Sequence, residues 1–254
     1  MSVAIVGAAL AAVALWGATP IATKLAVAEL TPVTVGMLRT TLAALLTLPL
    51  LVGWRLRPPR RAAQLVLLAM VTLGGLIGFP LLFSLGVGRT SAAHAGLILA
   101  ALPLPTGLIG SAFERRLPPG AWWLGAAVAL LGEAFLIGAD RAAGTPVATL
   151  AGDLLVAGGA ICAAAGHVAG ARLAPSFGTW PTTLWAITAG GALLLPLLLW
   201  QGGAAALGAA GATTWAAVLF LAGGSTLVAF AAWYWALSRG GIARMGALQF
   251  LQPL

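Results

Sequence analysis

Long apolar runs alternate with short polar links along the whole chain. The runs cover residues 3–28, 33–54, 62–86, 91–113, 119–139, 152–172, 180–200 and 212–238, and another begins at residue 243. A helix needs roughly 20 apolar residues to cross the hydrocarbon of a bilayer, and the first eight runs each have that length. The pattern predicts an all-α membrane protein with about 8.5 transmembrane helices.

Composition and charge placement support this interpretation. Hydrophobic residues make up 61% of the chain and charged residues 7%, far below the roughly 25% charged residues of a soluble domain. With a cytoplasmic N-terminus, nine arginines fall in cytoplasmic links, and only Arg89 and Arg141 fall outside. Arginine-rich short links mark the cytoplasmic side of a membrane protein. The placement of the arginines therefore explains the net charge of +8 without a nucleic-acid partner, and it predicts a multi-pass protein of the cell (inner) membrane.

Two stretches of the chain align without a gap when one is shifted by 150 residues. An interval of five helices is odd, so the second copy is expected to lie inverted in the membrane. The repeats predicted in this way are residues 1–140, with five helices, and residues 150–254, with three helices and part of a fourth. Inverted repeats are typical of secondary transporters, whose substrate site lies near the midplane. The identical pairs are Gly74/Gly224, Arg89/Arg239, Ala93/Ala243, Gly96/Gly246, Pro103/Pro253 and Leu104/Leu254.

The segments "ALWGATPIATKLA", "TPVTVGMLRTTLAAL" and "GVGRTSAAHAGLILAALPLPTGLIGSAFERRLPPG" resemble one EamA repeat of the drug/metabolite transporter superfamily. The residues that carry this resemblance are Trp16, Gly17, Lys24, Arg39, Pro103 and Glu114. "GGIARMGALQFLQPL" is similar to part of the second repeat. The resemblance implies ten helices in two five-helix repeats, with both ends in the cytoplasm. Because the chain stops inside the ninth helix, we expect the functional protein to be longer.

Three ionisable residues are candidates for gating or coupling: Lys24, Arg39 and Glu133. Ionisable groups inside a membrane are costly and usually face a cavity or a partner. Lys24 and Arg39 lie within about two turns of the outer surface, where snorkelling to the interface is the alternative. Glu133 lies too deep for that, so it either pairs with a cation or stays protonated. A protonated Glu133 is a candidate for proton coupling, and the alternative is one buried hydrogen bond between helices.

The candidate substrate-binding residues are aromatic, hydroxyl, amide and imidazole side chains inside the predicted spans, together with one mid-span proline. A pocket lined by such groups would suit a small amphipathic or aromatic solute better than a strong anion. With two histidines and one cysteine, Cys162, no metal site and no cofactor are expected. The candidates are Trp16, Thr19, His94, Pro103, His167, Trp185, Tyr234, Gln249 and Gln252.

These features favour a secondary transporter that exports small organic solutes, such as amino acids, metabolites or amphipathic drugs, by alternating access. A channel or lipid scramblase remains the alternative, and an intramembrane enzyme is disfavoured because no nucleophile, base and orienting group occur together. The expected partners are a small-molecule substrate and membrane lipid, with proton coupling through Glu133 and a monomeric or homodimeric state.

Overall fold

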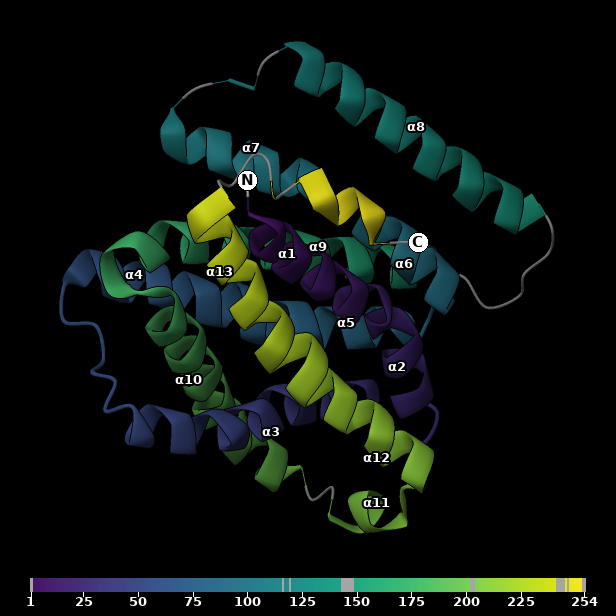
Figure 1. Cartoon of the computed structure of the whole chain (residues 1–254). Helices are drawn as coiled ribbons and strands as arrows, with labels where there is room; N and C mark the ends of the chain where they lie inside the picture. The colour runs from purple at the N-terminus through teal and green to yellow at the C-terminus, as the bar shows by residue number, and fades with distance from the viewer. Residues whose placement is uncertain are drawn as a thin grey trace.

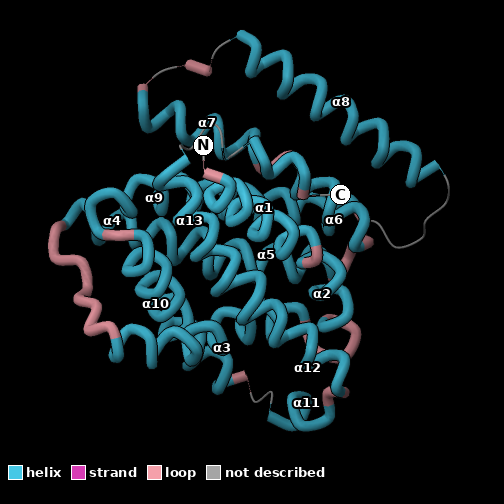
Figure 2. The backbone as a smooth tube through the Cα atoms, in the orientation of Figure 1, coloured by secondary structure: helices cyan, strands magenta, loops and turns pink. Residues whose placement is uncertain are grey.

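The computed structural model describes residues 2–115, 117–118, 120–142, 149–201, 204–240, 245 and 247–252, and every regular element among them is a helix (Figures 1 and 2). The predicted all-α class is confirmed. The helices are α1 (Val3–Gly17), α2 (Thr19–Ala26), α3 (Pro32–Gly53), α4 (Ala62–Met70), η1 (Val71–Gly78), α5 (Phe79–Val87), α6 (Ala92–Ala100), α7 (Pro103–Glu114), α8 (Gly120–Ala142), α9 (Leu150–Phe177), α10 (Thr179–Trp200), α11 (Ala204–Ala209), α12 (Ala212–Leu219), η2 (Phe220–Val228), α13 (Ala229–Gly240) and η3 (Ala247–Leu251).

Within the described residues, seven continuous helical stretches are long and apolar enough to cross a membrane. They coincide with seven of the eight complete apolar runs. The remaining run, 119–139, forms the 23-residue helix α8, which lies at the edge of the bundle beside α6 and α7 (Figure 1). The seven stretches are Val3–Ala26, Pro32–Gly53, Ala62–Val87, Ala92–Glu114, Leu150–Phe177, Thr179–Trp200 and Ala212–Gly240.

Hydroxyl side chains fix where several of these spans begin. Thr31 accepts a hydrogen bond from the backbone N–H of Thr34 at the start of α3, and Ser91 accepts one from His94 at the start of α6. Thr149 does the same for α9. Such caps satisfy N–H groups that have no partner inside the helix, so each span starts at a defined residue.

Four of the spans change their helical geometry near the middle. The first is interrupted at Ala18, two residues before Pro20, and the fourth between Ala100 and Pro103. A proline inside a span removes one backbone hydrogen bond, which explains these two breaks. The third and seventh spans instead contain π-helical turns, η1 and η2, which fall at nearly equivalent places under the 150-residue shift.

Small residues allow the helices at the centre to approach closely. α3 packs along α10, and a Cβ on Gly191 would collide with the Cβ of Ala44. η1 crosses α9 where a Cβ on Gly74 would lie 2.6 Å from the carbonyl oxygen of Cys162. Such approaches are how membrane helices gain van der Waals contact without a hydrophobic driving force between them.

The last apolar run differs from the expectation. The described part of this run forms a five-residue 3₁₀ helix, η3, in place of the beginning of an α-helix. Its buried side chains, Gln249 and Gln252, contact the bundle interior.

Candidate functional site

A small buried cavity lies where the broken spans meet. Its volume is about 20 Å³, which is room for about one water molecule, and all nine residues that line it are buried. The helices of both predicted repeats contribute to its wall. The lining residues are Trp16, Thr19, Phe79, Leu99, Leu102, Ala163, His167, Phe230 and Gln252.

The cavity lies at the level of the helix interruptions. Trp16 and Thr19 flank the break between α1 and α2, and Leu102 lies in the break between α6 and α7. Phe79 directly follows the π-helical turn η1, and Phe230 is the second residue after η2. Interrupted helices free backbone groups and are tolerated in a membrane where they line a cavity.

The indole of Trp16 forms the aromatic centre of this wall. It stacks on the His167 ring at 5.1 Å and meets Phe230 and Trp233 edge-on at 5.4 Å each. Its Nε1 donates a hydrogen bond of 3.0 Å to the carbonyl oxygen of Ser225. Trp16 is therefore held in one orientation by a hydrogen bond and by rings from α9 and α13.

Two glutamines of the C-terminal segment complete the polar part of the site. Gln252 lines the cavity. The Nε2 atom of Gln249 lies 3.4 Å from Nδ1 of His167. Both side-chain oxygens are buried and have no hydrogen-bond partner within the described residues. Unpaired buried acceptors are costly, so this wall favours a ligand that carries a donor.

Arg39 lies behind the cavity wall and does not snorkel, since its side chain is 1% exposed. Its Nε and Nη2 donate to Thr226 Oγ1 at 3.2 Å, and Nη2 also donates to Ser225 Oγ at 3.0 Å. Ser225 Oγ lies 2.7 Å from Oγ1 of the cavity residue Thr19. The guanidinium is thus one hydrogen-bonded residue away from the cavity.

Sequence reasoning missed Ser225 and Thr226. Both are fully or almost fully buried in η2 and accept the hydrogen bonds that Arg39 makes within the described residues. The signal was two hydroxyl residues in the middle of an apolar run that also contains no charge until Arg239. Nothing in the sequence alone pairs them with an arginine in a distant helix.

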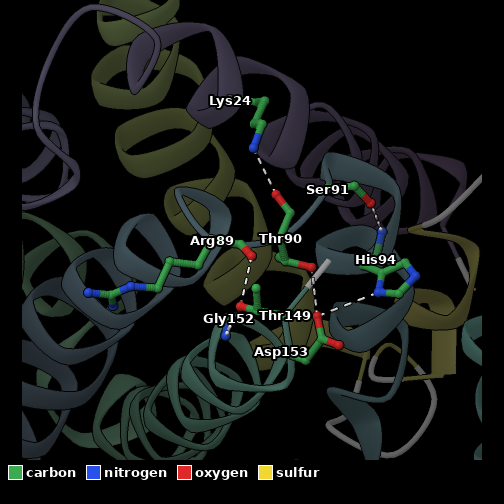
Figure 3. A network of polar contacts seen from close by, with 8 residues as sticks. All are labelled: Lys24, Arg89, Thr90, Ser91, His94, Thr149, Gly152 and Asp153. Carbon is green, nitrogen blue, oxygen red and sulfur yellow. Dashed lines mark hydrogen bonds and ion pairs between the residues drawn. The ribbon is translucent and has the colours of Figure 1, made fainter. Parts of the chain in front are cut away.

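A second polar network closes one end of the bundle (Figure 3). Lys24 donates to the carbonyl oxygens of Val87 and Thr90 at 2.9 and 2.8 Å. The Thr90 hydroxyl donates to Asp153 Oδ1 at 2.6 Å, and His94 Nδ1 lies 3.5 Å from the same oxygen. The network therefore joins α2, α6 and α9.

Asp153 was not among the predicted site residues. It lies in the first turn of α9, where the helix dipole stabilises a negative charge, and its side chain is buried with that of His94. Arg89, from the same link as Thr90, extends away from the two (Figure 3). Asp153 is the second residue of the apolar run predicted at 152–172, and nothing in the sequence pairs it with His94 in a distant helix.

Of the nine predicted substrate-binding residues, the structure brings Trp16, Thr19, His167 and Gln252 together on the cavity wall. The other five lie elsewhere in the bundle. His94 belongs to the network with Asp153, and Pro103 begins α7. Gln249 contacts His167, and Trp185 of α10 packs against the hydrophobic core. Tyr234 donates a hydrogen bond of 3.2 Å to the carbonyl oxygen of Gly166.

Two of the three gating candidates, Arg39 and Lys24, lie in different parts of the structure. Arg39 lies beside the cavity, and Lys24 lies in the network at the end of the bundle. The side chain of Glu133 lies outside the described part of the structure, as do Pro253 and Gly246. Among the described residues, no cluster of three or more metal-ligating side chains occurs.

Apolar helices that break around a buried, partly polar cavity at mid-span have the architecture of membrane transporters. Comparison with known proteins gives the same class. The model of the EamA-like transporter family matches residues 3–138 and again residues 150–254, so the chain belongs to the EamA-like transporter family. The resemblance seen in the sequence is confirmed.

Two individual proteins extend this result. The chain is 30% identical over 236 residues to "Uncharacterized transporter YdeK" of Bacillus subtilis (strain 168), covering 91% of this chain and 79% of that protein. A protein of known crystal structure superposes with a TM-score of 0.70 at 23% identity, covering 100% of this chain and 85% of the other. The similarity to this crystal structure supports the assigned fold.

Proposed function

We propose that this membrane transporter is a secondary carrier that exports small organic solutes by alternating access between two inverted repeats. The cavity on which the helix breaks converge is the observation that carries the proposal. Side chains from residues 3–138 and from residues 150–254 line it together, as expected for a site at a repeat interface. Its rings, hydroxyl, imidazole and amide suit small amphipathic solutes, among them amino acids, other metabolites and amphipathic drugs.

The closed state of the cavity favours a carrier over a channel. Every lining side chain is less than 10% exposed, and the volume admits about one water molecule. A solute can therefore enter only after the helices around the cavity separate. Interrupted helices, π-helical turns and glycine-lined crossings are where such a rearrangement would take place.

The orientation follows from the arginine-rich links. We place the N-terminus and the links after α3 and α7 in the cytoplasm of an inner-membrane protein, because these two links carry six of the twelve arginines. The network of Lys24, Thr90, His94 and Asp153 then closes the outer end. Proton coupling through Glu133 is part of the proposal and predicts that Glu133→Gln abolishes any pH dependence of transport.

The experiment is counterflow in proteoliposomes made with the purified protein and loaded with a candidate solute. A carrier gives saturable uptake that is accelerated by solute on the opposite side. Trp16→Ala should abolish this exchange because it removes the centre of the cavity wall, whereas Trp123→Ala, on the exposed surface of α8, should leave it intact. Linear, unsaturable flux without trans-stimulation would instead indicate a channel or scramblase.

A further inference from the structure

Arg39 carries a buried positive charge that no described acid neutralises. A guanidinium stays charged at neutral pH, yet its partners among the described residues are two neutral hydroxyls, and none of these residues accepts a hydrogen bond from its Nη1. The described carboxylates act elsewhere: Glu29 accepts from Gly211, Asp153 belongs to the network at the end of the bundle, and Glu114 ends α7. Burying a charge without an opposite charge is strongly unfavourable, and the described residues leave the Arg39 charge without one.

The guanidinium of Arg39 lies next to the cavity wall. The guanidinium carbon of Arg39 is 5.5 Å from the centroid of the Phe79 ring, and Phe79 is part of the cavity wall. On another side, Ser225 connects Arg39 to the cavity residue Thr19 through bonds of 3.0 and 2.7 Å. A ligand group that displaced the Thr19–Ser225 hydrogen bond would reach the guanidinium directly.

The rest of the wall is suited to the other end of such a ligand. Trp16, stacked on His167, and the edge of Phe230 offer apolar ring surface, and the unpaired oxygen of Gln252 accepts a hydrogen bond. The other cation of the outer half, Lys24, is engaged with backbone carbonyls at the end of the bundle. Among the described residues, one guanidinium therefore lies directly behind the cavity wall, which matches a single negative charge.

We propose that Arg39 binds the carboxylate of the transported solute, so that the substrates are small monocarboxylates with an apolar or aromatic body. This inference rests on the proposed carrier function. The planar guanidinium presents two parallel N–H groups that fit the two carboxylate oxygens, which a lysine ammonium cannot do. Binding supplies the missing opposite charge and leaves the apolar body against the rings.

Three ligands of nearly equal shape test the assignment on the purified wild-type protein: phenylacetate, its neutral amide phenylacetamide, and the cation phenethylammonium. Affinities are measured by calorimetry, and exchange by counterflow in proteoliposomes. Phenylacetate should bind about tenfold or more tightly than phenylacetamide, since hydrogen bonds to charged groups are the stronger ones, and phenethylammonium should bind least.

Variants of Arg39 then test whether this residue is the source of the preference for the acid over the amide. Arg39→Lys should lower the affinity for phenylacetate about tenfold and leave the affinity for phenylacetamide unchanged. The lysine keeps the positive charge but lacks the two parallel N–H groups of the guanidinium. Arg39→Gln should bring the acid and the amide to equal affinity. Arg57→Gln, which removes an exposed arginine from the link after α3, is the matched control and should retain the wild-type ratio. The acid-to-amide ratio separates binding from a merely structural role, which would lower stability and leave the ratio unchanged.

The outcomes distinguish this inference from the carrier proposal. Exchange of neutral or cationic solutes with phenylacetate no better than phenylacetamide would overturn the carboxylate site and leave the carrier intact. An unchanged ratio in Arg39→Gln would also overturn it. Unsaturable flux of every solute would contradict the carrier proposal itself.

Discussion

Ser225 is the residue through which Arg39, Thr19 and the cavity are joined, so Ser225→Ala is the most informative single change. It removes the bonds to Arg39 Nη2 and Thr19 Oγ1, but it keeps the backbone carbonyl that holds Trp16. A hydrogen bond to a charged group contributes about 1.5–3 kcal/mol and a neutral one about 0.5–1.5 kcal/mol. Because Arg39 keeps its bonds to Thr226, we expect a loss near the lower end, about 2 kcal/mol.

The assay is thermal unfolding of the purified protein in detergent, followed by tryptophan fluorescence. A loss of about 2 kcal/mol corresponds to a Tm lower by about 4–8 °C for a chain of this size. Ser238→Ala is the matched control, because that hydroxyl is exposed and bonds only to the carbonyl oxygen of Trp235 in its own helix. A Tm for Ser225→Ala within about 1 °C of this control would refute the reasoning, since it would put the two bonds together at no more than about 0.5 kcal/mol, below the average of about 0.6 kcal/mol for a single hydrogen bond between membrane helices.

Three further changes test other parts of the structure. Gly191→Ala should destabilise the protein by about 1–3 kcal/mol through overpacking against Ala44, measured by the same thermal unfolding, and an unchanged Tm would contradict the close crossing of α3 and α10. Asp153→Asn should cost about 1.5–3 kcal/mol by weakening its charge-assisted hydrogen bond, again seen as a lower Tm. Glu29, whose pKa is lowered from 4.5 by hydrogen bonds led by the Gly211 N–H, stabilises the folded state above pH 4.5 and loses this effect as pH falls through its lowered pKa. The Tm difference between wild type and Glu29→Gln should therefore shrink on acidification from pH 7 to pH 3, and a constant difference would show that the ionised Glu29 carboxylate does not stabilise the fold.

The sequence predicted the spans well because their signal is local. A run of apolar residues must be helical in lipid whatever surrounds it, and the seven described spans agree with the runs to within a few residues. The interior breaks were also foreseeable at Pro20 and Pro103. The π-helical turns were not, because they contain glycines and apolar residues that an α-helix in a membrane accommodates equally well.

The candidate site was predictable only in part. Trp16, Thr19, His167 and Gln252 were found because polar or aromatic side chains inside apolar runs are conspicuous one at a time. Which of them share a cavity depends on how the helices are rotated and where they cross, and this cannot be worked out from a single sequence. For the same reason, Tyr234 and Trp185 are equally conspicuous in the sequence yet face other helices.

Helices α3 and α10 have the same length but differ in charge. α3 and α10 are both 22 residues long, and the eighth residue is Arg39 in one and Ala186 in the other. The hydroxyls that hold Arg39 belong to η2, in the other family-matched region. If these regions move against one another as proposed, the bonds between Arg39 and η2 exist fully in only one of the two states. A ligand shifts such an equilibrium by its difference in affinity for the two states, so a carboxylate that satisfies Arg39 where η2 has moved away would stabilise the other state.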